Sequence, residues 1–86
     1  MEFDELQDMA ATAVKKDFRK NGYDIDVDLM VESLINVLNN FGGSDEEMKN
    51  QITGMTMLFF AIADRYKFDL QDALLNKIEG INKGSK

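Results

Sequence analysis

Three aspartates at alternate positions, Asp24, Asp26 and Asp28, are the residues whose type and spacing first suggest chemistry. A helix–loop–helix Ca²⁺ site begins this way, but it also needs glycine at position 6 and glutamate at position 12. Leu29 and Ile35 stand at those positions. Aspartates before a helix can instead accept hydrogen bonds from its first backbone N–H groups. We interpret the stretch as a helix start capped by Asp26 or Asp28, with weak binding of a hard cation as the alternative.

The composition excludes several kinds of catalytic site. The 86 residues include neither cysteine nor histidine, so Ser–His and Cys–His nucleophile pairs, disulfides and thiolate zinc sites are excluded. A glycine-rich phosphate loop of the GxxxxGK[ST] type is also missing from the sequence. Packing, carboxylate–metal binding or association with another chain are the remaining ways to stabilise so short a domain.

The charge pattern argues against two kinds of partner. Sixteen acidic and ten basic residues give a net charge of −6, which disfavours binding to a phosphate backbone. The first residues, MEFDELQD, are acidic, unlike a signal peptide. The longest nearly apolar run, residues 55–63, is too short to span a membrane. We expect a cytoplasmic protein that binds neither nucleic acid nor membrane.

Apolar residues recur at steps of three and four along the whole chain, which predicts helices and no strand. We expect one all-α domain over residues 1–86, a four-helix bundle-like fold with short connections. The expected helices are about 3–20, 28–41, 45–66 and 70–79, followed by a frayed tail over 82–86.

Local signals mark where these helices begin and end. Asn21-Gly22 and Gly42-Gly43 supply residues suited to left-handed helix ends. Ser44 followed three residues later by Glu47 is a capping box, in which each side chain binds a backbone N–H group near the other residue. Asp69 is the expected cap of the fourth helix.

The third predicted helix is apolar nearly all round, because Thr56 is the only polar residue between Met55 and Ala63. Such a helix must be enclosed on several sides, and short neighbouring helices offer little to enclose it. We expect a homodimer or a partner chain to cover it, and the alternative is that it simply lies at the bundle centre. The predicted interface residues are Met55, Met57, Phe59, Phe60 and Ile62.

Residues 55–83, MTMLFFAIADRYKFDLQDALLNKIEGINK, resemble the C-terminal part of the MazG-like all-α nucleotide pyrophosphatases. In that family, a helix that ends in a leucine-rich run and an alanine–aspartate pair leads into sequence of the type DLEEALLEKIEKN. Ala63-Asp64-Arg65 and the stretch DLQDALLNKIE at 69–79 follow this pattern. The earlier helices agree with the family only in number and rough length.

The resemblance implies Mg²⁺ held by an ExxE-type cluster on one helix and an ExxD pair on the next, for attack of water on a triphosphate. Carried over to this chain, the ExxD positions fall on Gln51 and Gly54. The glutamate cluster falls near residues 31–35, where Glu32 is the only acid. The resemblance therefore implies a member that keeps the fold without the catalytic centre, in which Gly54 would let another helix approach closely.

Three functions follow from these observations. We predict a non-catalytic helical protein of phage or mobile-element origin that acts through protein–protein interaction. This prediction includes no cofactor and no catalytic residues. It could instead be a nucleotide-binding protein in which Lys49 or Arg65 meets phosphates. The third is a divergent Mg²⁺-dependent nucleoside triphosphate pyrophosphatase, with candidate metal ligands Glu32, Glu46, Glu47 and Asp64.

Overall fold

The computed structural model describes residues 3–22 and 26–84, and the described part of the chain is built from helices without a strand. Four helices follow one another: α1 (Phe3–Lys20), α2 (Val27–Asn39), α3 (Asp45–Arg65) and α4 (Leu70–Gly84). The predicted all-α, four-helix class is confirmed. Among the described residues, no helix is both long enough and apolar enough to cross a membrane.

Asp26 is the N-cap residue of α2. The Asp26 carboxylate accepts a hydrogen bond from the Asp28 backbone N–H at 3.0 Å, and Asp26 itself has extended backbone geometry. This is the standard arrangement of an N-cap residue. Asp24 lies outside the described residues. The described part of the stretch is therefore the start of a helix, as predicted.

The end of α1 and the start of α3 follow the sequence signals, whereas α2 ends at Asn39, two residues before its predicted end, with Asn40 as its C-cap at a φ of −109°. Gly22, Gly42 and Gly43 all have positive φ, at 83°, 133° and 104°, a conformation that glycine adopts without steric cost. At the start of α3, the Glu47 backbone N–H donates to the Ser44 hydroxyl at 3.2 Å, and the reciprocal bond completes the capping box. Gly42 and Gly43 therefore lie in the turn between α2 and α3 and do not form the end of α2 itself.

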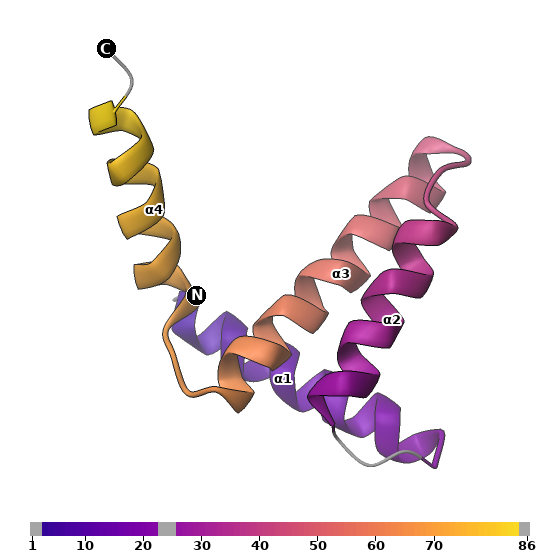
Figure 1. Ribbon diagram of the computed structural model, residues 1–86. Helices are drawn as coiled ribbons and strands as arrows, with labels where there is room; N and C mark the ends of the chain where they lie inside the picture. The colour runs from indigo at the N-terminus through magenta and orange to yellow at the C-terminus, as the bar shows by residue number, and fades with distance from the viewer. Residues whose placement is uncertain (1–2, 23–25, 85–86) are drawn as a thin grey trace.

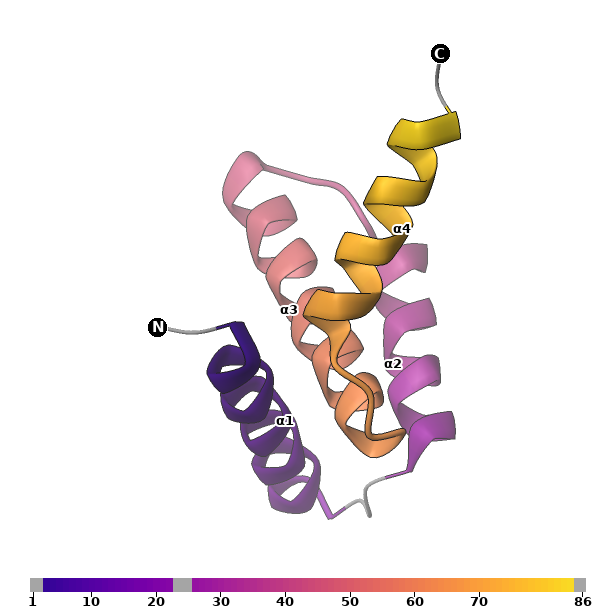
Figure 2. The same cartoon turned by 90° about the vertical axis from the view of Figure 1, so that its left-hand side faces the viewer.

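Helix α3 lies at the centre of the packed part of the molecule, as predicted. It packs mainly against α1 and less extensively against α2 (Figures 1 and 2). The buried cluster joins the three helices through Ala11 and Val14 of α1, Met30 and Leu34 of α2, and Leu58 and Ala61 of α3. Met30 is only 1% exposed, so it is the most deeply buried large side chain in this cluster.

Helix α4 departs from the bundle and points away from the hairpin formed by α2 and α3. The two arms form a V, with α1 running along its base (Figure 1). The radius of gyration is 14.6 Å, whereas a compact domain of this length would have about 12 Å. None of the residues of α4 is buried. The four helices therefore form a three-helix core with one projecting arm.

The C-terminal boundary of α4 corrects the sequence prediction. We expected the helix to stop near residue 79 and the tail from 82 to be frayed, but α4 continues through Gly80 to Gly84. Gly80 is not among the glycines with positive φ, so it does not adopt the left-handed conformation with which glycine often ends a helix. Ile81 extends the apolar spacing set by Leu74 and Ile78 by one more turn.

The turn between α3 and α4 sets the direction of the projecting arm. Lys67 has the left-handed φ of 59°. The Phe68 N–H donates to the Ala63 carbonyl at 3.2 Å, and the Lys67 N–H donates to the Asp64 carbonyl at 3.1 Å. These two bonds are those of a Schellman motif, which ends a helix sharply. The chain therefore leaves α3 at a fixed angle.

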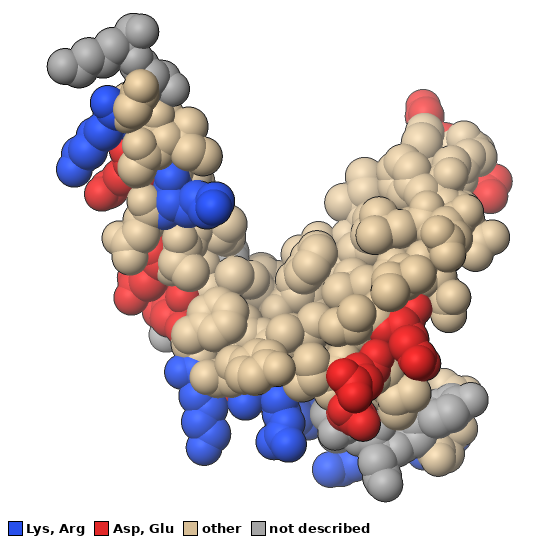
Figure 3. Space-filling model, in the orientation of Figure 1, with Lys and Arg blue, Asp and Glu red and all other residues tan. Residues whose placement is uncertain are grey.

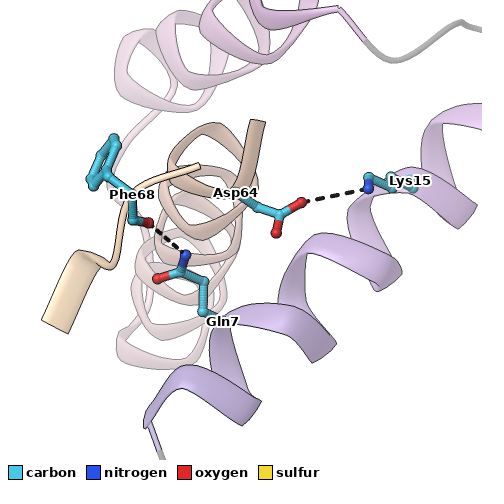
Figure 4. A network of polar contacts seen from close by, with 4 residues as sticks. All are labelled: Gln7, Lys15, Asp64 and Phe68. Atoms are coloured by element: carbon cyan, nitrogen blue, oxygen red, sulfur yellow. Dashed lines mark hydrogen bonds and ion pairs between the residues drawn. The ribbon is translucent and has the colours of Figure 1, made fainter. Parts of the chain in front are cut away.

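Gln7 of α1 fastens the start of α4 to the core (Figure 4). Its amide nitrogen donates to the Phe68 carbonyl at 3.1 Å, and its amide oxygen accepts from the Leu70 N–H at 3.1 Å. Gln7 is 8% exposed, so these bonds satisfy an amide that burial would otherwise leave unpaired. The first turn of α4 is therefore anchored, and the rest of the helix extends beyond the core.

Candidate protein-binding surface

The projecting arm creates an apolar cleft in the fork of the V, between α3 and α4. The cleft has a volume of about 400 Å³. Its walls are Thr56, Phe59, Phe60, Ile62 and Ala63 of α3, Phe68 of the connecting turn, and Leu70 and Leu74 of α4. We call this set the apolar cleft. Aromatic and aliphatic side chains make up all of it except one threonine.

The one polar side chain of the cleft is already satisfied within its own helix. The Thr56 hydroxyl donates its hydrogen bond to the Ile52 carbonyl at 2.8 Å. Its proton is therefore already paired without a ligand. No charged residue belongs to the lining. A surface of this kind binds by burying apolar area and offers no group that would orient a phosphate or a metal ion.

Helical spacing extends both walls of the apolar cleft toward the open end of the V. On α3, Ile52 lies one turn before Thr56 and is 53% exposed. On α4, Ile78 and Ile81 continue the row of Leu70 and Leu74, and they are 51% and 58% exposed. Figure 3 shows uncharged atoms covering most of the fork, apart from basic atoms on the α4 arm. A continuous exposed apolar surface makes this cleft the candidate interaction site of the described residues.

The predicted interface residues divide between the core and the cleft. Phe59 is 53% exposed and is available to a partner. Phe60 is only 5% exposed, although it belongs to the lining of the apolar cleft, and its role in an interface stays a prediction. Met55, Met57 and Ile62 are half-buried against the core, and only Ile62 of these three lines the apolar cleft.

Sequence reasoning missed the α4 half of the cleft. The spacing of Leu70, Leu74 and Ile78 supports the predicted fourth helix, but it did not indicate that Leu70 and Leu74 would line a cleft. Phe68 was also missed, and it is 44% exposed. A bundle core and an exposed binding face need the same apolar spacing, so the pattern by itself does not distinguish them.

The four acids proposed as metal ligands lie apart. Glu47 belongs to the capping box at the start of α3 with Glu46 beside it, whereas Asp64 lies at the other end of the helix. The 17 residues from Glu47 to Asp64 span about 26 Å of helix. The Asp64 carboxylate pairs instead with the Lys15 ammonium of α1 at 3.5 Å (Figure 4). Across the described residues, no three acidic side chains are grouped as a metal site would require.

Glu32 lines a separate hollow of about 320 Å³ between the end of α1 and α2, together with Asp17. Gln51, at one of the positions where the family resemblance expects an acid, has another role. Its amide oxygen accepts from the Gly42 N–H at 3.0 Å, and its amide nitrogen donates to the Gly42 carbonyl at 3.2 Å. Gln51 therefore fixes the turn between α2 and α3.

Gly54 does not mark a close helix approach within the chain. A side-chain carbon placed there would meet no heavy atom within 4 Å, and Gly54 instead lines a hollow between α1, α2 and α3. The expectation of a closely packed neighbour is therefore wrong for this fold.

Lys49 and Arg65, the proposed phosphate-binding residues, lie near opposite ends of α3. Sixteen residues separate them, or about 24 Å of helix. Neither residue lines the apolar cleft or the two hollows described above. The structure therefore does not bring them together around one ligand.

Comparison of the chain with protein-family models, with curated proteins and with solved structures found no match.

Proposed function

We propose that this protein is a non-catalytic helical module that acts by binding another protein chain through the apolar cleft between α3 and α4. The observation that carries the proposal is the cleft itself, because it combines an apolar lining with two exposed apolar rows that continue it. Aromatic side chains such as Phe59 and Phe68 are typical anchors of protein interfaces.

The shape of the cleft favours a helix as the bound element. Its walls are two diverging helices, and an amphipathic helix binds in a groove of that kind through residues spaced by three and four. The Schellman turn at Lys67 and the anchor at Gln7 hold the walls in place before a partner arrives. A preformed site reduces the entropy lost on binding.

In this proposal, the resemblance to the MazG-like pyrophosphatases over residues 55–83 reflects a shared helical fold and not a shared activity. In this proposal the chain retains the helical scaffold and uses it for assembly, as an accessory protein of a phage or mobile element in the cytoplasm. The separation of Glu46 and Glu47 from Asp64 supports a binding role over hydrolysis by those residues. Catalytic residues and a resident metal form no part of the proposal.

Photochemical cross-linking tests the proposal. Phe59 is replaced by benzoylphenylalanine, and the protein is irradiated both purified and inside cells of its source. We expect defined protein adducts from this position. The matched control carries the same group at Asn50, which is exposed on α3 but lies away from the cleft-lining row, and should give none. Equal adducts from both positions, or none from Phe59 in either setting, would contradict the proposed function.

Melting temperature addresses the enzymatic alternative in parallel. A ligand that binds the native state raises the melting temperature by mass action. We expect no shift with Mg²⁺ and a panel of nucleoside triphosphates. A Mg²⁺-dependent shift with one nucleotide would favour the pyrophosphatase or nucleotide-binding alternative.

A further inference from the structure

We propose that the occupant of the apolar cleft is a second copy of this chain, with the α4 of each copy lying in the cleft of the other. This inference rests on the proposed function and names its partner. The two α3 helices and the two α4 helices then form a four-helix core across a two-fold axis. Two equivalent contacts arise from one self-complementary surface, which is the usual form of a closed homodimer.

The exposed area of the chain matches what such a dimer needs. The chain exposes 6587 Å², whereas an isolated globular protein of 9.8 kDa exposes about 5,200 Å². The excess is about 1,400 Å², and a stable interface of standard size buries about 800 Å² on each partner. Reciprocal docking of α4 can therefore form a full interface and still leave part of the excess exposed.

Helix α4 has the properties of a docking element. It has 15 residues and buries none of them, and a helix of that length is marginal in water without packing. Its apolar row, Leu70, Leu74, Ile78 and Ile81, carries the spacing that a helical groove requires. The same chain thus provides both the groove and a helix that fits it.

The charge distribution favours this pairing over simple repulsion between two acidic chains. Residues 26–65, which form α2 and α3, carry seven acids and two bases, whereas residues 66–86 carry three acids and four bases. Figure 3 shows acidic side chains on the α2–α3 arm and both basic and acidic ones on the α4 arm. Reciprocal docking places the less acidic arm of each copy against the acidic arm of the other, and such complementarity fixes orientation.

Directed cross-linking tests the arrangement, because the chain has no cysteine of its own. One tagged chain carries Phe59→Cys and a differently tagged chain carries Ile78→Cys. After mixing, a short bis-maleimide should join the two tags in preference to either like pair. The matched pair Asn50→Cys and Asn76→Cys uses the same helices away from the cleft-lining rows and should give at most a tenth of that yield.

Sedimentation equilibrium provides the second readout. We expect the mass of two chains for the wild type. Ile78→Glu places a charge in the interface and should weaken dimerisation at least about tenfold. Asn76→Glu adds the same charge away from the Leu74–Ile78 row and should leave the dimer intact. Circular dichroism of both variants checks that the overall helix content is retained.

Two results would overturn the second-copy proposal. One is a wild type that stays monomeric up to several hundred micromolar, and the other is a dimer that Ile78→Glu leaves unchanged and whose cross-links do not join Phe59 to Ile78. A monomer that still gives Phe59 adducts with other proteins in cells would reject only the second copy and retain the proposed function. A monomer without any such adduct would reject both.

Discussion

Gln7 connects the core to the projecting arm through both ends of one buried amide. The atoms it bonds, the Phe68 carbonyl and the Leu70 N–H, lie more than 60 residues away along the chain. The nearby Lys15–Asp64 pair also joins α1 to the end of α3, but both side chains are partly exposed, and an exposed ion pair contributes little to stability. Of these two contacts made by α1, the Gln7 bonds therefore contribute more to the position of α4.

Replacing Gln7 with alanine should lower the free energy of unfolding by about 1–3 kcal/mol, because two partly buried backbone groups lose their partner. Urea denaturation at a fixed protein concentration measures the change, since association adds to apparent stability. Gln71→Ala removes an exposed glutamine from α4 and should change stability by less than about 0.5 kcal/mol. Equal effects of the two substitutions would show that the Gln7 bonds do not hold the arm.

Lys67 adopts a left-handed conformation that non-glycine residues tolerate poorly. Its φ is 59°, and that region costs an L-residue about 1–2 kcal/mol. Lys67→Gly should therefore stabilise the protein by about 0.5–1 kcal/mol, the balance between relief of this cost and the greater freedom of the unfolded chain.

Thermal and urea unfolding of Lys67→Gly and Lys67→Ala separate the backbone effect from loss of the lysine side chain. Alanine keeps the steric cost of the left-handed backbone, so Lys67→Ala should be close to neutral. A stabilisation by alanine as large as that by glycine would indicate that the lysine side chain, and not its backbone, is unfavourable here.

At the scale of the elements, the sequence was sufficient wherever a few neighbouring residues decide the outcome. The capping box of Ser44 and Glu47 and the cap of Asp26 both depend on residues within one helical turn. The spacing of apolar residues at steps of three and four was enough to predict the four helices. The predicted C-terminal boundary of α4 was wrong because a glycine near the end of a helix favours termination but does not enforce it.

The direction of α4 could not be predicted from residues that are neighbours in the sequence. It depends on a lysine in a conformation usually reserved for glycine and on a glutamine from the other end of the chain. Neither residue type signals such a role in the sequence. The candidate site shared this difficulty, since Phe59 was predicted as an interface residue on α3, whereas Phe68 and Leu74, which line the same cleft, were not.

At the scale of the whole molecule, the central feature is an open V. The apolar cleft and the continuing rows leave Phe59, Leu74 and Ile78 about half exposed, which is costly in water. Covering the cleft would bury these side chains and would give α4 the packing it lacks. The fold and the proposed association are therefore two aspects of the same apolar surface.

Hydrogen exchange of the α4 backbone amides across a dilution series tests this account most directly. Amides of a helix without buried residues exchange fast unless packing protects them. We predict that protection of α4 falls on dilution, while the core amides around Met30 and Leu58 stay protected. Rapid exchange of α4 at every concentration, or equal protection at the lowest and highest concentrations, would contradict stabilisation of α4 by a second chain.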